Sequence, residues 1–202
     1  MSPRALTDQE KEFQRQKILA KAKDLILNHG VKKVSVDDMI KAAGVGKATF
    51  YNHFAGKETL LMQLVWEIYQ DFLTQAKRLI QDSSAEKLRQ NVGAFLRSIL
   101  HDREKVFFFI NHRELEDLIA SLKTEEIRDF NQLECQAFES LILLAGLDVD
   151  KVKPGVVHNY LHAIYFAISD DALIPEYLDE TITAMTEGLL DYLFGTETCY
   201  EG

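Results

Sequence analysis

Apolar positions recur at helical spacing along almost the whole chain, and the most informative pattern lies between Val34 and Leu61. Ser35, with an acidic residue three positions on, predicts a capped helix N-terminus. The apolar face of this short helix is Val36, Met39, Ile40 and Ala43. Gly44 predicts its end, because glycine adopts a positive φ at no steric cost. A second short helix is expected from Lys47 to Phe54, with both of its phenylalanines facing inward. The pattern therefore predicts a helix-turn-helix.

The same stretch carries a longer signature. The run AGVGKATFYNHFAGKETLL resembles the DNA-binding signature of the tetracycline-repressor (TetR) family of bacterial transcription regulators. The Thr-aromatic-Tyr run, the His-Phe pair and the Lys-Glu opening of the next helix all match. Gly46 departs from the pattern, since the family more often has Ser there, and one hydroxyl contact to phosphate is expected to be missing. The close resemblance covers about the first third of the chain, and beyond it implies only an all-helical layout.

The outer face of the second short helix holds the candidate DNA contacts. Lysines supply charge to phosphates, whereas hydroxyls and an imidazole give directional hydrogen bonds that set the register on the duplex. The resemblance implies mainly backbone contacts, while Ala48 and Asn52 are placed to approach a thymine methyl and an adenine. Lys57 also lies at a helix N-terminus, which attracts phosphate. The predicted DNA-binding residues are Ser35, Gly46, Lys47, Ala48, Thr49, Tyr51, Asn52, His53 and Lys57.

The rest of the chain also reads as helices, about nine in all, with no convincing strand. Ser83 and Glu86 predict a capping box at the start of one of them. The run VFFFI, residues 106–110, is too short for a membrane and is expected to form a buried helix. The other helices are expected at about Gln9–Asn28, Lys57–Ile80, Thr124–Ala145, Gly155–Ser169 and Pro175–Phe194. The sequence thus predicts an all-α fold with a DNA-binding domain at residues 1–56 and a ligand-binding and dimerisation domain at 57–202.

The charge distribution changes how the composition is read. The 202 residues carry a net charge of −9, which alone argues against a nucleic-acid partner. However, residues 1–57 contain 11 Lys/Arg and 6 Asp/Glu, a net of +5, while the remainder contains 12 and 26, a net of −14. A basic head on an acidic body suits a protein that touches a polyanion with one end, although chance clustering of charge is the alternative.

Composition also bounds the cellular setting. No apolar run approaches the roughly 18 residues that span a membrane, and the polar N-terminus excludes a secretory signal. Cys135 and Cys199 have neither metal-ligand spacing nor the number expected of a disulfide framework. A cytoplasmic protein with no membrane partner and no cofactor is expected.

The second half of the chain offers candidate ligand and dimer contacts. Aromatic side chains suit a pocket for an apolar or amphipathic molecule, but they serve equally well as core. The candidate ligand-binding residues are Trp66, Tyr69, Phe95, Phe108, His112 and Tyr165. The resemblance implies a homodimer in which the last two helices form a four-helix bundle across the dimer axis. The candidate interface residues are Val157, Leu161, Ile164, Ile168, Ile182, Met185, Leu189 and Leu193.

Two histidines are the remaining chemical candidates. His158 and His162 lie four apart and could share a metal on one helical face, but no carboxylate or cysteine is spaced in sequence to complete a site. Structural or interfacial histidines are the favoured interpretation, and no metal site is expected. No catalytic signature such as G-x-S-x-G or H-E-x-x-H is present, so no catalytic residue is assigned. The expected function is a ligand-responsive DNA-binding regulator, with repression implied by the resemblance. The alternative is an enzyme or small-molecule carrier whose helix-turn-helix is non-functional.

Overall fold

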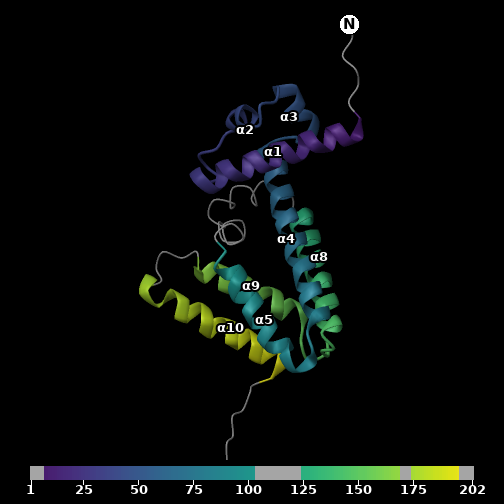
Figure 1. Cartoon of the computed structure of the whole chain (residues 1–202), viewed down its shortest axis with the longest axis vertical. Coiled ribbons are helices and arrows are strands. Elements are labelled where there is room, and N and C mark those ends of the chain that lie inside the picture. Colours follow the sequence, from purple (N-terminus) through teal and green to yellow (C-terminus); the bar gives the residue numbers. More distant parts are fainter. Residues whose placement is uncertain (1–6, 103–123, 169–173, 196–202) are drawn as a thin grey trace, which may run out of the picture. The chain divides into compact units, whose positions relative to one another are not determined.

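The computed structural model describes residues 7–102, 124–168 and 174–195, and this part of the chain is all-α with no strand (Figure 1). The prediction of an all-α fold is confirmed, and eight α-helices and one 3-10 turn are described. They are α1 (Asp8–His29), α2 (Val36–Ala43), α3 (Lys47–His53), α4 (Lys57–Asp82), α5 (Ala85–Leu100), α8 (Thr124–Leu144), α9 (Pro154–Ile168), η1 (Pro175–Tyr177) and α10 (Leu178–Phe194). The predicted VFFFI helix, Phe108, His112 and Cys199 lie outside the described residues.

The described residues form two compact units. The first unit comprises residues 7–67, and the second comprises 68–102, 124–168 and 174–195. The boundary falls inside α4, between Glu67 and Ile68, so one helix supplies residues to both units. None of the described helices is both long enough and apolar enough to serve as a membrane span.

Capping chemistry fixes the helix starts in the first unit. Thr7 accepts a hydrogen bond from the backbone N–H of Glu10, and the Glu10 carboxylate accepts from the Thr7 N–H, which completes a capping box on α1. Ser35 and Asp38 make the same reciprocal pair on α2, as the sequence predicts. Each pair satisfies backbone donors that a helix N-terminus otherwise leaves without partners. The core beneath these helices is apolar and fully buried: Ile18, Leu19, Ala22, Ile26, Met39, Phe50, Leu60, Leu61 and Leu64.

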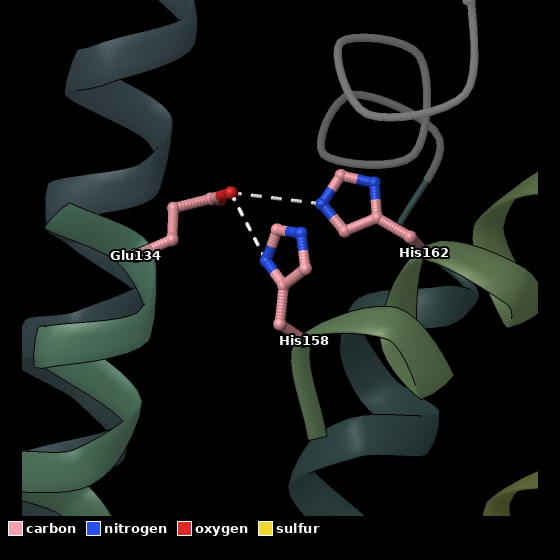
Figure 2. Close-up of side chains that lie close together, drawn as sticks. All are labelled: Glu134, His158 and His162. Carbon is pink, nitrogen blue, oxygen red and sulfur yellow. Dashed lines mark ion pairs between the residues drawn. The ribbon is translucent and has the colours of Figure 1, made fainter. Parts of the chain in front are cut away.

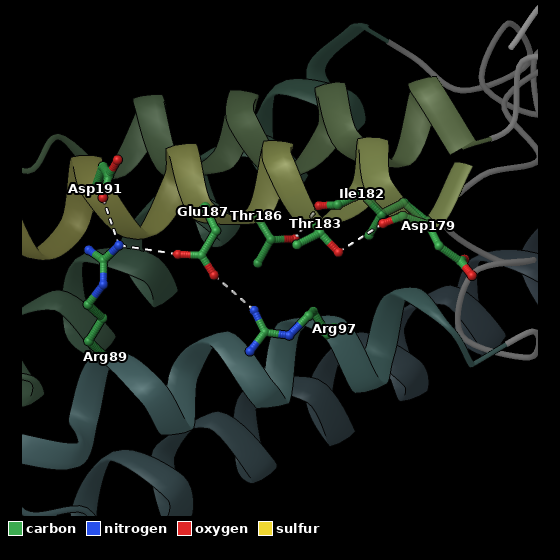
Figure 3. Close-up of polar contacts among 8 residues, drawn as sticks. All are labelled: Arg89, Arg97, Asp179, Ile182, Thr183, Thr186, Glu187 and Asp191. Atoms are coloured by element: carbon green, nitrogen blue, oxygen red, sulfur yellow. Dashed lines mark hydrogen bonds and ion pairs between the residues drawn. The ribbon is translucent and has the colours of Figure 1, made fainter. Parts of the chain in front are cut away.

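The second unit packs α10 against α5 and α9, and α8 against α9. Ion pairs join α5 to α10 at the surface of this packing (Figure 3). The Arg89 guanidinium lies 2.7 Å from the Asp191 carboxylate and 3.2 Å from that of Glu187, and Arg97 lies 3.1 Å from Glu187. Arg89 also donates to the carbonyl oxygen of Gly195, so it caps the last turn of α10. The two helices are therefore held by directional polar contacts as well as by their apolar faces.

The start of α5 differs from the prediction. The expected capping box of Ser83 and Glu86 is wrong, because the N-cap is Ser84, whose side chain makes no capping hydrogen bond. The Ser83 hydroxyl instead donates to the carbonyl of Leu79 at 2.6 Å and accepts from the Asn91 amide at 2.8 Å. Ser83 thus directly follows the last residue of α4, and its hydroxyl bonds back to the carbonyl four residues before it.

The apolar residues of α8 are not all buried. Phe138, Leu141 and Ile142 are buried, whereas Leu133 and Leu144 are exposed. The buried positions follow one side of the helix that faces α9, and the exposed leucines lie off that side. Periodicity alone predicts an apolar stripe but not how much of its width a neighbouring helix covers.

Candidate nucleic-acid interface

The turn between α2 and α3 is set by its two glycines. Gly44 closes α2 in the left-handed conformation, with φ 63° and ψ 39°, and its N–H donates to the Ile40 and Lys41 carbonyls. Gly46 is the N-cap of α3 with φ −79° and ψ 156°, an extended conformation open to any residue. The chain therefore needs glycine at the first position but not at the second.

α3 is divided sharply into a buried and an exposed side. Phe50 and Phe54 are buried, with ring centroids 5.7 Å apart, which confirms the prediction that they face inward. The residues that form the exposed face of α3 are Lys47, Ala48, Tyr51 and Asn52. The Tyr51 and Phe50 rings pack edge to face, with centroids 5.4 Å apart. Tyr51 is nevertheless 48% exposed. The buried phenylalanines thus anchor α3 to the core of the first unit, with its exposed side chains facing outward.

The predicted lysines differ in their surroundings. The Lys47 ammonium lies 3.5 Å from the Asp37 carboxylate on α2, and both side chains are largely exposed. Such a surface pair is worth roughly 0–1 kcal/mol, so it does not hold Lys47 away from another anion. The half-buried Lys57, in contrast, donates to the carbonyl oxygen of Val31. Lys57 therefore braces the loop between α1 and α2, a structural role that its place in the sequence does not reveal.

Two of the remaining predicted contacts, Ser35 and His53, have polar partners within the first unit. His53 is half-buried, with its Nε2 3.5 Å from the Gln14 side-chain oxygen on α1, and Thr49 is half-buried as well. The Ser35 hydroxyl donates to the Asp38 carboxylate at 2.6 Å and accepts from its backbone N–H. The hydrogen bonds that the Asp38 carboxylate accepts from the hydroxyl and the backbone N–H of Ser35 lower the pKa of Asp38. Ser35 is thus engaged in capping α2, and the four residues on the exposed face of α3 are the most available donors and contacts.

α1 contributes less free positive charge than its sequence indicates. The Arg15 guanidinium donates two hydrogen bonds of 2.9 Å to the Glu12 carboxylate and lies 3.6 Å from Glu67. The hydrogen bond from Arg15, helped by one from Gln16, lowers the pKa of Glu12 to about 2. The charge of Arg15 is therefore largely compensated inside the first unit.

The second unit contains an apolar cavity of about 80 Å³. Phe95, one of the predicted ligand contacts, lies in its wall next to Phe72, with ring centroids 5.7 Å apart. The wall is formed by apolar residues from five helices and from the loop after α8: Phe72, Ala76, Leu79, Ile80, Val92, Phe95, Leu96, Phe138, Leu141, Ile142, Ala145, Leu147, Val157, Leu161, Leu189, Leu193 and Phe194. This chemistry suits an apolar guest.

A second cavity, of about 20 Å³, brings together two more predicted ligand contacts. Tyr69 and Tyr165 both line it, together with Glu134 and His162. Burial raises the pKa of both tyrosines, and the charge of Glu134 adds to this effect at Tyr69. Trp66 lies in the first unit and lines neither cavity. The structure thus sets Trp66 apart from the other predicted ligand residues that it describes, which line two cavities that share Phe72, Phe138 and Leu161 in their walls.

The predicted dimer residues lie mostly inside the second unit. Five of the eight are buried in a single chain: Val157, Leu161, Ile164, Ile182 and Leu189. The other three, Ile168, Met185 and Leu193, are half-buried. Four of the eight line the 80 Å³ cavity. Periodicity selects the apolar side of each helix, and in α9 and α10 that side is largely used by the core of the protomer.

Comparison with known proteins extends the similarity seen in the helix-turn-helix. Residues 18–64 match the family described as bacterial regulatory proteins, tetR family. The chain is 27% identical over 185 residues to the HTH-type transcriptional repressor DhaR of Mycobacterium sp. (strain GP1), a match that covers 87% of this chain and 92% of DhaR.

A second relative and a solved structure add to this. The chain is 36% identical over 94 residues to the dhaKLM operon transcriptional activator DhaS of Lactococcus lactis, covering 46% of each protein. Its fold is similar to that of a TetR-family transcriptional regulator from Pectobacterium atrosepticum, with a TM-score of 0.64 and 18% identity over 94% of this chain and 96% of that one. The similarity therefore reaches well beyond the residues of the helix-turn-helix.

Proposed function

We propose that this chain, which belongs to the TetR family of bacterial transcription regulators, contacts its operator through the exposed face of α3 and represses transcription as a homodimer until a small apolar molecule enters the second unit. The observation that carries this proposal is the exposed face itself. Lys47, Ala48, Tyr51 and Asn52 stand outward on a helix whose opposite side is anchored by a fully buried phenylalanine. The protein acts where the DNA is, in the cytoplasm.

The division of labour on this face follows from the side chains. Lys47 and the Tyr51 hydroxyl contact phosphates and fix the register, since such contacts carry little sequence information. Ala48 and Asn52 meet base edges, where alanine fits a thymine methyl and asparagine can pair with adenine. Lys57 acts mainly by holding the loop before α2, because its ammonium already bonds the Val31 carbonyl.

Salt dependence tests the phosphate role of Lys47. Operator affinity should fall steeply with salt, because each neutralised phosphate releases counterions. Lys47→Ala should weaken binding to every sequence and reduce the slope of log K against log salt by about 1. Lys151→Ala is the matched control, since it also removes one exposed lysine near a carboxylate, but in the second unit. An unchanged slope in the Lys47 variant, or an equal loss in the control, contradicts the assignment.

The homodimer requires surface that the protomer core does not use. On α9, Phe166 is 56% exposed and Val156 41% exposed, whereas Ile164 is completely buried. Ile164→Arg therefore tests the core and not the interface. Phe166→Glu should give monomers by light scattering, because an interface cannot readily bury an unpaired charge. Phe13→Glu, on the exposed side of α1, is the control and should leave the dimer intact. A stable dimer in the Phe166 variant would exclude this face.

The ligand proposal rests on the apolar cavity. At about 80 Å³ it is smaller than a cavity of about 150 Å³ known to hold benzene, so a larger guest must push the lining apart. Because α4 contributes Phe72 to the cavity wall and also continues from the first unit, displacement of α4 can alter the placement of α3. A coupling of about 1–3 kcal/mol, typical of allostery, corresponds to roughly 5- to 150-fold weaker operator binding.

Reciprocity gives the test of release. An apolar compound found by thermal shift should lose affinity in the presence of saturating operator by the same factor by which it weakens operator binding. Ala76→Leu adds side-chain volume at the cavity wall and should abolish the response while operator binding persists. A compound whose dissociation constant is the same with and without operator is not the signal.

The sign of regulation needs its own experiment, because DhaR is a repressor and DhaS an activator. A reporter gene behind the operator should be silent with the protein and active without it. The reverse result would establish an activator. The alternative function is that of an enzyme or a small-molecule carrier. A gel shift that shows no binding to DNA from upstream of the protein's own coding region would favour this alternative.

A further inference from the structure

Three polar side chains meet between α8 and α9 in the second unit (Figure 2). His158 and His162 stand one turn apart on α9 with ring centroids 4.3 Å apart, and both face Glu134 on α8. The Glu134 Oε2 lies 3.2 Å from His158 Nδ1 and 3.7 Å from His162 Nε2. One nitrogen or oxygen from each residue lies within 4.8 Å of the other two. We name these three residues the Glu–His–His cluster.

Glu134 and His158 lie deepest in the cluster, whereas the His162 side chain is 39% exposed. The Glu134 side chain is only 4% exposed and that of His158 13%. Although their atoms are 3.2 Å apart, the alignment is not that of a hydrogen bond, and neither Glu134 Oε2 nor His158 Nδ1 has a hydrogen-bond partner among the described residues. A buried polar atom without a partner costs about 1–3 kcal/mol, which is rarely tolerated without a reason.

Electrostatics favour an ionised carboxylate at this place. Burial acts to raise the pKa of Glu134, but the two neighbouring imidazoles act against it and leave the pKa below its usual value. When both imidazoles are neutral, the carboxylate and the two rings place three donor atoms within 4.8 Å of one another. These three atoms can bind one metal cation, or the two imidazoles can instead take up protons.

We propose that the Glu–His–His cluster binds a divalent transition-metal ion of the zinc type. Two imidazole nitrogens and one carboxylate oxygen are a donor set that Zn²⁺ uses when a fourth position stays open. At metal–ligand distances of about 2.0–2.1 Å, tetrahedral ligand atoms stand roughly 3.3 Å apart. The observed 3.2 and 3.7 Å separations bracket this value. Nitrogen donors disfavour Mg²⁺ and Ca²⁺, which prefer oxygen.

The surroundings leave room for the fourth ligand. Glu134 and His162 line the cavity of about 20 Å³, which exceeds the volume that one water molecule needs. Tyr69 lines the same cavity, and its hydroxyl donates to the Glu134 backbone carbonyl at 3.5 Å, linking α4 to this part of α8. The open position is therefore available to water or to a donor atom of an effector. This site goes beyond the proposed function, and its test requires no DNA.

The competing interpretation is a structural network in which protonated imidazole neutralises Glu134 and no ion binds. Chelator-treated, full-length protein titrated with Co²⁺ should develop the visible absorption of a four-coordinate ion at one equivalent per chain. Zn²⁺ should displace the Co²⁺, with a dissociation constant below about 1 µM. Failure of the wild-type protein to bind Co²⁺ and Zn²⁺ at this stoichiometry would overturn the proposal.

Variants locate the ion. Zn²⁺ binding should be weakened at least 100-fold by each of Glu134→Gln, His158→Gln and His162→Gln. Loss of a residue that only hydrogen-bonds a metal ligand already lowers metal affinity about 10- to 100-fold. Glu139→Gln on the exposed side of α8 and His101→Gln at the end of α5 are matched controls and should bind normally. Unchanged affinity in the cluster variants would place the ion elsewhere and refute the assignment.

A variant that fails to fold would also lose the ion, so X-ray absorption of the wild-type zinc complex provides a test that needs no variant. It should show imidazole and oxygen ligands and no sulfur. A sulfur ligand would implicate Cys135, the cysteine next to Glu134, and contradict the proposed donor set.

Discussion

The same substitution at two glycines in one turn should change stability in opposite directions. Gly44 has φ 63°, and a Cβ built there would meet nothing closer than the Lys17 ammonium at 3.9 Å. Gly46 has φ −79°, and its Cβ would lie 3.8 Å from the Thr49 hydroxyl oxygen. Both sites have room for a Cβ. The effects of serine at the two positions should therefore differ only through the backbone conformation and through helix capping.

The expected magnitudes follow from these conformations. Gly44→Ser should destabilise the first unit by about 1–2 kcal/mol, since a non-glycine residue is strained in the left-handed region. Gly46→Ser should stabilise it by about 0.5–1 kcal/mol, because the unfolded chain loses freedom and the hydroxyl caps α3 better than glycine does. The two variants should therefore differ by roughly 2 kcal/mol, or about 30-fold in the unfolding equilibrium.

Trp66 makes the measurement specific. It is the only tryptophan of the chain and belongs to the first unit, so urea denaturation followed by its fluorescence reports on that unit. Gly46→Ser should also bind operator about 2- to 10-fold more tightly if its hydroxyl reaches a phosphate. Shifts of the same sign in both variants would refute the conformational reasoning, and a stabilised variant with unchanged affinity would refute only the phosphate contact.

Two further predictions concern the second unit. Burial raises the pKa of Tyr165 above that of an unfolded tyrosine, about 10, so its contribution to stability holds below pH 10 and is lost as the pH rises further. Alkaline unfolding should therefore be weaker in Tyr165→Phe than in the wild type, while Tyr177→Phe, on an exposed ring, should match the wild type; equal curves for both variants would contradict this. Arg89→Met should cost about 1 kcal/mol in urea denaturation, a modest figure because its carboxylate partners are more than 40% exposed, and Arg97→Met should cost less.

The sequence predicts the helices well wherever local chemistry decides. The Ser35 and Asp38 capping box, the end of α2 at Gly44 and the inward Phe50 all follow from neighbours within a few residues. Ser83 shows the limit of the same reasoning. Its spacing to Glu86 fits a capping box, but the Ser83 hydroxyl donates to the Leu79 carbonyl of the preceding helix instead.

The candidate sites depend on contacts that no local pattern contains. Glu134 lies 24 residues before His158, so only the packing of α8 on α9 brings the carboxylate to the two histidines. The sequence signal was that Glu134 stands four residues before Phe138 and seven before Leu141, on the apolar side of the predicted helix. Likewise, the apolar stripe of α9 identifies Ile164 as covered, but not whether the cover is the protomer core or a partner. Lys57 has the same ambiguity between phosphate and the Val31 carbonyl.

Selection of binding sites from a random pool of duplex DNA tests the central claim most directly. Wild-type protein should enrich a near-palindromic sequence whose half-sites are spaced by about one helical turn or a multiple of it, as two copies of α3 require. Asn52→Ala should relax the preference at one position of each half-site, whereas Lys47→Ala should weaken binding without changing the selected sequence. Enrichment of no sequence, or an identical preference and affinity in both variants, would contradict the assignment of the exposed face of α3 to operator DNA.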